Sequence, residues 1–430
     1  MSGAAADTIF ALATGAGRAA IAVLRIGGPD SAAALTALCG RLPPARRAVV
    51  RALRSADGDL LDRAMVLWLP GPGTYTGEDS AELHLHAGPA VIAAVAGALA
   101  AAGLRHAEPG EFTRRAFLNG KLDLVAAEAV LDLVAAETDA QRRQALRQLD
   151  GALGDLYRDW SGRLRLALSR QEALIDFPDE DLPPEVEANL LAAVSSLRVE
   201  IGTHLNDGHR GEKLREGLFF AICGAPNVGK SSLINALAER DVSIVSATPG
   251  TTRDAIETRV VFGGVPVTIV DTAGLRETGD PIEAEGVRRA RARAEAADLV
   301  VTVIESGAPI EKHPAGLIVA NKCDLHADQR PEVIPVSALS GAGLELLRAR
   351  LAERAAALTQ SGGPPPLTRA RHRAALQTAA HWLAEAENTI APELRGEAMR
   401  LALRALGSIT GQIGVEEILD SIFRQFCIGK

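Results

Sequence analysis

The chain has 430 residues, of which 47% are hydrophobic and 23% charged, and its formal net charge is −8. This composition excludes a wholly disordered chain, and the length exceeds one ordinary hydrophobic core, so we expect two to four domains. The negative charge argues against a surface coated in cations for non-specific nucleic-acid binding, although it leaves room for a local basic patch.

The cysteines and the apolar runs point to a cellular compartment. The four cysteines (Cys39, Cys223, Cys323, Cys427) show neither metal-ligand spacing nor the density of a secreted disulfide scaffold, which favours a reducing cytoplasm. No uncharged apolar run reaches the length of about 18 residues that a transmembrane helix needs, and no positive region precedes the first apolar stretch as in a signal peptide. We therefore expect a cytoplasmic protein without a membrane partner.

The pattern of elements divides the chain into four segments. Residues 1–120 mix short β-type runs with Gly and Pro punctuation, which predicts an α+β domain. Residues 121–215 carry Leu, Val and Ala at helical spacing, interrupted at 178–184, and helical spacing returns within 361–430. Strands alternate with helices across 216–360, which predicts a mostly parallel sheet. We interpret 216–360 as a domain inserted into a discontinuous helical domain.

The strongest motif is GAPNVGKS, residues 224–231, which matches G-x-x-x-x-G-K-[ST] between a strand-like run and a helix-like run. Backbone amides of such a loop surround phosphates at a helix N-terminus. Lys230 is expected to reach the outer phosphates and the Ser231 hydroxyl to bind Mg²⁺. The expected nucleotide contacts here are Asn227, Val228, Gly229, Lys230, Ser231 and Ser232.

Two further motifs follow predicted strands and identify the base as guanine. DTAG after VPVTIV places a carboxylate near Mg²⁺ and a glycine amide near the γ-phosphate, and NKCD after GLIVA places an Asp that can accept from the guanine N1 and N2 edge. VSALSG fits a loop that closes over the base. The expected contacts are Asp271, Thr272, Ala273, Gly274, Asn321, Lys322, Asp324, Ser337 and Ala338.

The segment between the P-loop and DTAG is expected to order on GTP binding. We assign Thr252 to the Mg²⁺ shell. Leu275 stands where Ras-type enzymes carry a water-orienting Gln, so Glu283 is our candidate for that task, although a solvated acid is the alternative interpretation. Arg253 is a further catalytic candidate, and the remaining contacts in this segment are Ser246, Ala247, Thr248, Pro249, Gly250 and Thr251.

Taken together, these motifs resemble the tRNA modification GTPase family, MnmE or TrmE. The resemblance covers nearly the whole chain, because DTIFALATGAGRAAIAVLRIGG, GPGTYTGEDSAELHLHAGP, PGEFTRRAFLNGKLDLVAAEAVLDLV, LIDFPDED and the C-terminal FCIGK also look like family signatures. It implies a folate-binding-like N-terminal domain that forms a homodimer. It also implies K⁺ at the G site, held by Asn227 and by residues of the loop 246–251 (Ser246, Thr248, Thr251).

The resemblance further implies a reaction: with the flavoprotein MnmG (GidA), the family installs an aminomethyl-type group at carbon 5 of the tRNA wobble uridine. A tetrahydrofolate derivative of the 5-formyl or 5,10-methylene type supplies one carbon. The positions that would contact it are Arg25, Glu82, Lys121 and Lys430. Cys427 beside Lys430 has two open interpretations, a thiol in the chemistry or a half-buried packing residue.

Several observations leave alternatives open. A regulatory GTPase that binds RNA or ribosomes and modifies nothing would explain the G motifs but not the N-terminal signatures or FCIGK. His84 and His86 alternate as metal ligands can, but strand and surface roles fit better. The arginine-rich stretches 41–54, 288–293 and 369–373 suit tRNA contact, a solvated helix face or ion pairing. The residues between 306 and 317 are too few for a crossover helix, which puts the sheet topology there in doubt.

Overall fold

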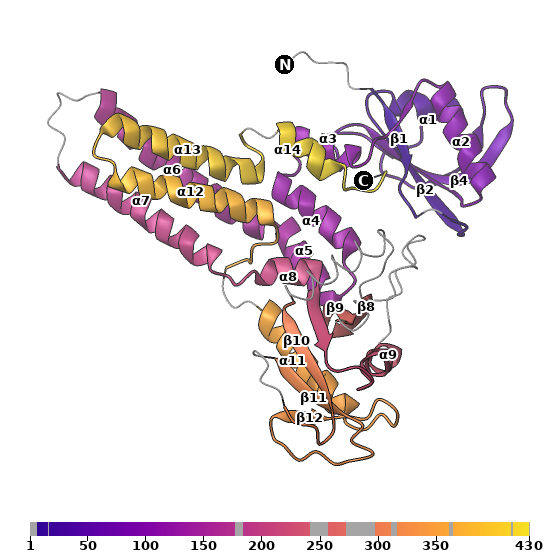
Figure 1. The fold of residues 1–430 in the computed structure, drawn as a ribbon. Coiled ribbons are helices and arrows are strands. Elements are labelled where there is room, and N and C mark those ends of the chain that lie inside the picture. Colours follow the sequence, from indigo (N-terminus) through magenta and orange to yellow (C-terminus); the bar gives the residue numbers. More distant parts are fainter. Residues whose placement is uncertain are drawn as a thin grey trace, which may run out of the picture. The chain divides into compact units, whose positions relative to one another are not determined.

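The computed structural model describes residues 7–15, 17–176, 184–240, 257–271, 297–310, 316–360, 364–413 and 416–429. The chain forms two compact units, one of residues 1–131 with 406–430 and one of residues 132–405 (Figure 1). The predicted combination of mixed α/β parts with an all-helical part is confirmed.

The first unit contains a six-stranded sheet in the order β3-β4-β5-β2-β1-β6. All neighbouring strands are antiparallel except β1 and β6, which are parallel. The strands are β1 (Ile9–Leu12), β2 (Ile21–Gly27), β3 (Val49–Arg54), β4 (Leu60–Leu69), β5 (Ser80–His86) and β6 (Arg105–His106). The β-type runs that the sequence predicts at 20–26, 64–69 and 82–86 correspond to β2, β4 and β5, whereas β1, β3 and β6 were not predicted.

Alternation along these strands buries one face of the sheet. Leu24 and Ile26 of β2 and Leu83 and Leu85 of β5 are at most 1% exposed, because helices α1 (Ser31–Cys39) and α2 (Pro89–Ala101) pack against the sheet. Arg25, Glu82 and His84, which alternate with buried residues along β2 and β5, are half-buried and share the opposite face. That second face is therefore available for polar side chains.

The C-terminal tail packs within the same unit. Helix α14 (Glu416–Phe423) and Phe426 form a small core with Leu124 and Ala127 of α4 (Leu124–Ala135). Gly110 is the N-cap of helix α3 (Glu111–Leu118), and a Cβ atom there would lie 2.7 Å from the Phe423 carbonyl oxygen. The last turns of the chain are thus held against the N-terminal segment.

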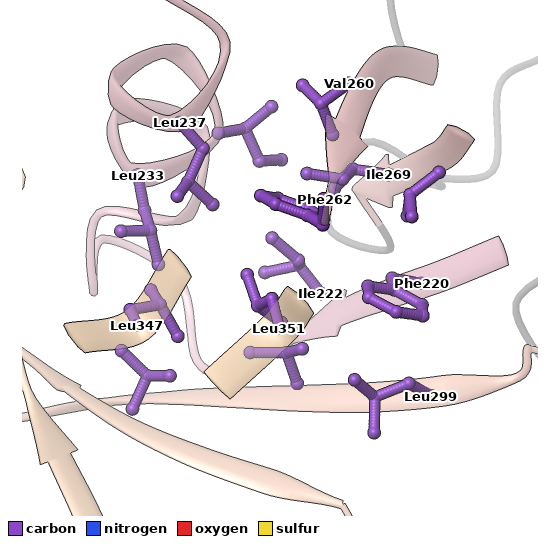
Figure 2. Packing of buried hydrophobic residues seen from close by; sticks show 14 of the residues in the cluster. Phe220, Ile222, Leu233, Leu237, Val260, Phe262, Ile269, Leu299, Leu347 and Leu351 are labelled. Carbon is purple, nitrogen blue, oxygen red and sulfur yellow. The ribbon is translucent and has the colours of Figure 1, made fainter. Parts of the chain in front are cut away.

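The second unit contains the six-stranded sheet β12-β11-β10-β7-β9-β8, parallel except for the β8–β9 hairpin. Its strands are β7 (Leu218–Cys223), β8 (Glu257–Phe262), β9 (Val265–Asp271), β10 (Leu299–Glu305), β11 (Leu317–Asn321) and β12 (Val333–Pro335). Figure 2 shows how Leu233 and Leu237 of α9 (Lys230–Arg240) meet Leu347 and Leu351 of α11 (Leu344–Thr359) over Ile222. This core fixes the strand ends that carry the motifs.

The doubt about the sheet topology near residues 306–316 is not borne out, since β10 and β11 pair in parallel over five residue pairs. The first residues of the connection are held by hydrogen bonds. Ser306 N donates to the Asn321 carbonyl at 2.9 Å, and Arg330 Nη1 donates to the Ala308 carbonyl at 2.9 Å. The same guanidinium pairs with Asp328 and lowers its pKa, and Asp328 accepts from Gly307 N. These bonds hold residues 306–308 against the segment that follows β11.

The remaining helices belong to the all-helical part, and the long helical stretch predicted from residue 121 is broken into several. A capping box at Thr138 and a left-handed Gly151 (φ +99°) separate them. The helices are α5 (Asp139–Leu149), α6 (Ala152–Asp176), α7 (Pro184–Leu205), α8 (Arg210–Glu216), α12 (Ala370–Asn388) and α13 (Pro392–Thr410). None of the helices in the described ranges is both long and apolar enough to cross a membrane.

Two arginines of the stretch 369–373 are ion-paired rather than free for tRNA. Arg369 Nη2 lies 2.6 Å from Asp132 Oδ1, and Arg373 Nη2 lies 2.7 Å from Asp207 Oδ1; each arginine is 9% exposed. Burial of a charge with its partner makes both arginines structural. The ion-pairing interpretation therefore holds for them.

Candidate functional site

The P-loop connects the end of β7 to the start of α9. Gly224 (φ +148°), Asn227 (φ +65°) and Gly229 (φ +90°) adopt left-handed conformations that turn the chain tightly. A Cβ atom at Gly224 would lie 2.1 Å from the Val303 carbonyl oxygen. The loop therefore requires glycine at this position for its close approach to β10.

Lys230 is buried in this loop at 5% exposure. Its Nζ donates to the carbonyl oxygens of Gly224 at 2.8 Å and Ala225 at 2.7 Å. An ammonium that donates to neutral carbonyls at a helix N-terminus suits a phosphate, because an anion there would gain from both the charge and the helix dipole.

Ser231 and Asp271 meet across the sheet edge. Ser231 Oγ donates to Asp271 Oδ2 at 3.1 Å, although the two residues are forty positions apart in sequence. A hydroxyl and a carboxylate side by side are hard oxygen ligands, and this donor set fits Mg²⁺. Parallel strands that end at one edge produce this meeting.

Asn321 links three loops. Its Nδ2 donates to the Val228 carbonyl in the P-loop at 2.8 Å, and its Oδ1 accepts from Ala338 N at 3.0 Å. It is 3% exposed, so both bonds are shielded from water. Asn321 thus supports the P-loop and the loop of residues 336–341, a role that sequence reasoning did not assign to it.

The predicted base-binding residues surround this link. Lys322 has a left-handed backbone (φ +66°), and its Nζ lies 3.3 Å from Glu305 Oε2. Asp324 is exposed, whereas Ser337 is fully buried and its Oγ accepts from Ser340 N at 3.1 Å. The exposed Asp324 carboxylate, three residues beyond the end of β11, is accessible to the edge of a base.

A second cluster lies on the half-buried face of the first unit's sheet. Arg25 of β2 and Glu82 of β5 are paired residues of neighbouring antiparallel strands, and Arg25 Nη2 lies 3.2 Å from Glu82 Oε1. The Arg25 guanidinium carbon lies 5.9 Å from the Tyr75 ring centroid and 5.7 Å from that of Phe112. Burial raises the pKa of Tyr75, whose hydroxyl shares a hydrogen bond with Thr113.

The loop of residues 74–78 also approaches Lys121. A Cβ atom at Gly77 would lie 2.9 Å from Lys121 Cε, and Tyr75 in the same loop contacts Arg25. The tail reaches this sheet too, because a Cβ at Gly429 would lie 2.4 Å from the Leu12 carbonyl oxygen. Cys427 is exposed, which contradicts its half-buried interpretation.

Comparison with known proteins identifies the family. A model described as "MnmE helical domain" matches residues 124–427, and one described as "GTP-binding protein TrmE N-terminus" matches residues 8–121. The chain is 61% identical over 428 residues to tRNA modification GTPase MnmE of Gluconacetobacter diazotrophicus, with 98% of each chain covered. The chain belongs to the MnmE family.

Other relatives carry the same name. The MnmE proteins of Granulibacter bethesdensis and Rhodospirillum rubrum are 56% and 53% identical, each with 99% of both chains covered. Among solved structures, the FeoB G domain of Methanococcus jannaschii is 24% identical with a TM-score of 0.22, covering 32% of this chain and 97% of that one.

Some predicted site residues lie outside the described ranges and stay predictions. They are Ser246, Ala247, Thr248, Pro249, Gly250, Thr251, Thr252, Arg253, Thr272, Ala273, Gly274, Glu283 and Lys430.

Sequence reasoning missed one residue of the N-terminal cluster. His84 Nε2 lies 3.5 Å from Glu82 Oε2. The period-2 alternation that puts both side chains on one face was visible in the sequence. The pairing of Glu82 with Arg25 depends on the strand register and was not visible in the sequence.

Proposed function

We propose that this chain is a potassium-dependent GTP hydrolase that modifies tRNA. With a flavoprotein of the MnmG (GidA) type, it would install a carboxymethylaminomethyl-type group at carbon 5 of the wobble uridine. The observation that carries the proposal is the convergence of Ser231, Asp271 and Asn321 at one sheet edge. The family membership supports the tRNA reaction.

The described residues define what the chain itself would do at the G site. Lys230 would exchange its two carbonyl partners for phosphate oxygens, and Ser231 and Asp271 would hold Mg²⁺, which neutralises charge on the phosphates. The Asp324 carboxylate would accept from guanine. We further propose that Asn227 and residues 246–251 hold K⁺ and that Thr252 completes the Mg²⁺ shell.

Hydrolysis breaks the bond between the γ-phosphorus and the β–γ bridging oxygen as water attacks, and a positioned base orients that water. We assign this task to Glu283. Glu283→Ala should lower turnover roughly 100-fold with little change in GTP affinity. Glu285→Ala, two residues on, is the matched control; equal turnover in both variants would return Glu283 to a solvated acid.

The N-terminal cluster is our proposed site for a tetrahydrofolate derivative. Arg25, Lys121 and Lys430 would face the anionic glutamate tail, and Glu82 the donor edge of the pterin. We also propose the four-segment division at 120, 215 and 360, a homodimer formed through residues 1–120, and a cytoplasmic location. Cys427, which is exposed in the C-terminal tail of the chain, is a candidate for the one-carbon chemistry.

Mass spectrometry of wobble nucleosides in tRNA tests the proposal directly. Cells lacking this protein should lose the modified uridine, and the wild-type gene should restore it. The competing function is a regulatory GTPase that modifies nothing. It would leave the wobble nucleosides unchanged, and its purified chain would not bind a reduced folate.

A further inference from the structure

The two carboxylate oxygens of Glu82 face different partners. Oε1 lies 3.2 Å from Arg25 Nη2 and accepts a hydrogen bond from it, while Oε2 lies 3.5 Å from His84 Nε2. The side chains of Arg25, Glu82 and His84 are between 22% and 26% exposed. Glu82 therefore lies between a guanidinium and an imidazole on a half-buried sheet face.

His84 Nε2 has no contact with solvent and no hydrogen-bond partner among the described residues. A buried nitrogen without a partner costs free energy, so a nearby acceptor or donor should attract it. The residues opposite His84 on the neighbouring strands are Val23 and Met65, which offer no strong acceptor. Glu82 Oε2 is the acceptor in reach, and a movement of about half an ångström would close a normal hydrogen bond.

Lone-pair counting shows what such a bond would do. An ionised carboxylate offers about four acceptor positions, two on each oxygen. With Arg25 on Oε1 and His84 on Oε2, one position remains on each oxygen. Two adjacent acceptors of this kind match a ligand edge with two parallel N–H donors, such as N3–H and the 2-amino group of a reduced pterin.

We propose that His84 is a positioning residue for Glu82: its Nε2–H donates to Oε2 and holds the carboxylate so that both oxygens face the pterin donors. The inference rests on the folate site proposed above. It predicts that His84 acts only on ligands that use both oxygens, whereas a residue that merely supports the fold would affect every ligand of this site.

Calorimetric titration of the intact protein with 5-formyltetrahydrofolate tests this role. His84→Leu should weaken binding about tenfold, because one charge-assisted hydrogen bond is lost. His84→Gln, whose amide nitrogen can reach the place of Nε2, should stay within about threefold of wild type. His84→Asn is the matched control with a shorter amide and should resemble His84→Leu.

A second ligand separates positioning from folding. An analogue with a methyl group in place of the 2-amino group cannot use both oxygens, so wild type and His84→Leu should bind it equally. An equal loss for both ligands, or wild-type affinity in His84→Leu and His84→Asn, would overturn the inference alone. Failure of the wild-type protein to bind 5-formyltetrahydrofolate would overturn the folate site and, with it, this inference.

Discussion

The two sheets build their sites in different ways. In the parallel sheet of the second unit, Ser231 bonds to Asp271 and Asn321 bonds to the P-loop, because the carboxyl ends of the strands share an edge. In the antiparallel sheet of the first unit, Arg25, Glu82 and His84 meet on a face because the strand register places them side by side.

The difference shows which kind of site can be predicted from a sequence alone. An edge site needs only that each motif follow a strand, so its members can be collected without knowing how the strands pair. A face site depends on strand order and register, which a shift of one residue would destroy. Because the two sites use separate elements, variants of one should leave ligand binding at the other unchanged.

The largest change in affinity is expected from the residue that would bind the guanine base. Asp324→Asn replaces an acceptor with a donor opposite guanine N1 and N2, and GTP affinity should fall roughly 100-fold. Xanthosine triphosphate, which carries a carbonyl at position 2, should bind the variant better than GTP does. Competition with a fluorescent nucleotide measures both affinities. Unchanged GTP affinity would remove Asp324 from the base site.

A comparison of two glycine substitutions tests whether the Asn321 link between the loops at the sheet edge is needed. A Cβ at Gly229 would lie 2.3 Å from Asn321 Nδ2, so Gly229→Ala should break the link between the loops and weaken GTP binding roughly 50-fold. Gly264→Ala is the matched control, because Gly264 also has a positive φ (+82°) but no described atom within 4 Å of that position. Equal GTP affinities in the two variants would mean that the Asn321 contact is not needed.

A substitution of Arg25 should affect the site on the sheet face (Arg25, Glu82 and His84) and leave the nucleotide site unchanged. Arg25→Leu removes the partner of Glu82 Oε1, and binding of 5-formyltetrahydrofolate should weaken about 30-fold while GTP turnover stays at the wild-type rate. Arg47→Leu, at an exposed position of the same unit, is the control. A parallel fall in GTP turnover would show that the two sites are not independent.

The smallest effect is expected when potassium is replaced by sodium. At matched ionic strength, GTP hydrolysis should be roughly tenfold faster in KCl than in NaCl, since a cation in the site stabilises charge on the β–γ oxygens. Folate binding should be equal in the two salts. Equal hydrolysis rates would remove the potassium role from Asn227 and its neighbouring loop.

Much of the edge site was predictable because each motif carries its own context. Lys230, Ser231 and Asp271 lie where the strand-then-motif pattern placed them. The structural task of Asn321 was not predictable, since its two hydrogen bonds join loops far apart in sequence. The doubt about the sheet topology near residues 306–316 was wrong because β10 and β11 pair in parallel, and that pairing has no local sequence signature.

The face site came only from resemblance. Nothing in the residues around Arg25 or Glu82 shows that they pair, and His84 was taken for a strand or surface residue. Its burial depends on β2 and β4 on either side of β5, and these pairings follow from tertiary structure. Reading the sequence with the correct register would have placed all three side chains together.

Titration of the purified chain with GTP and with ATP, in magnesium and potassium, tests the central claim most directly. The account predicts saturable GTP binding and at least roughly 100-fold weaker ATP binding, because adenine lacks the donor edge that Asp324 would accept. Equal binding of the two nucleotides, or no binding of GTP, would contradict it.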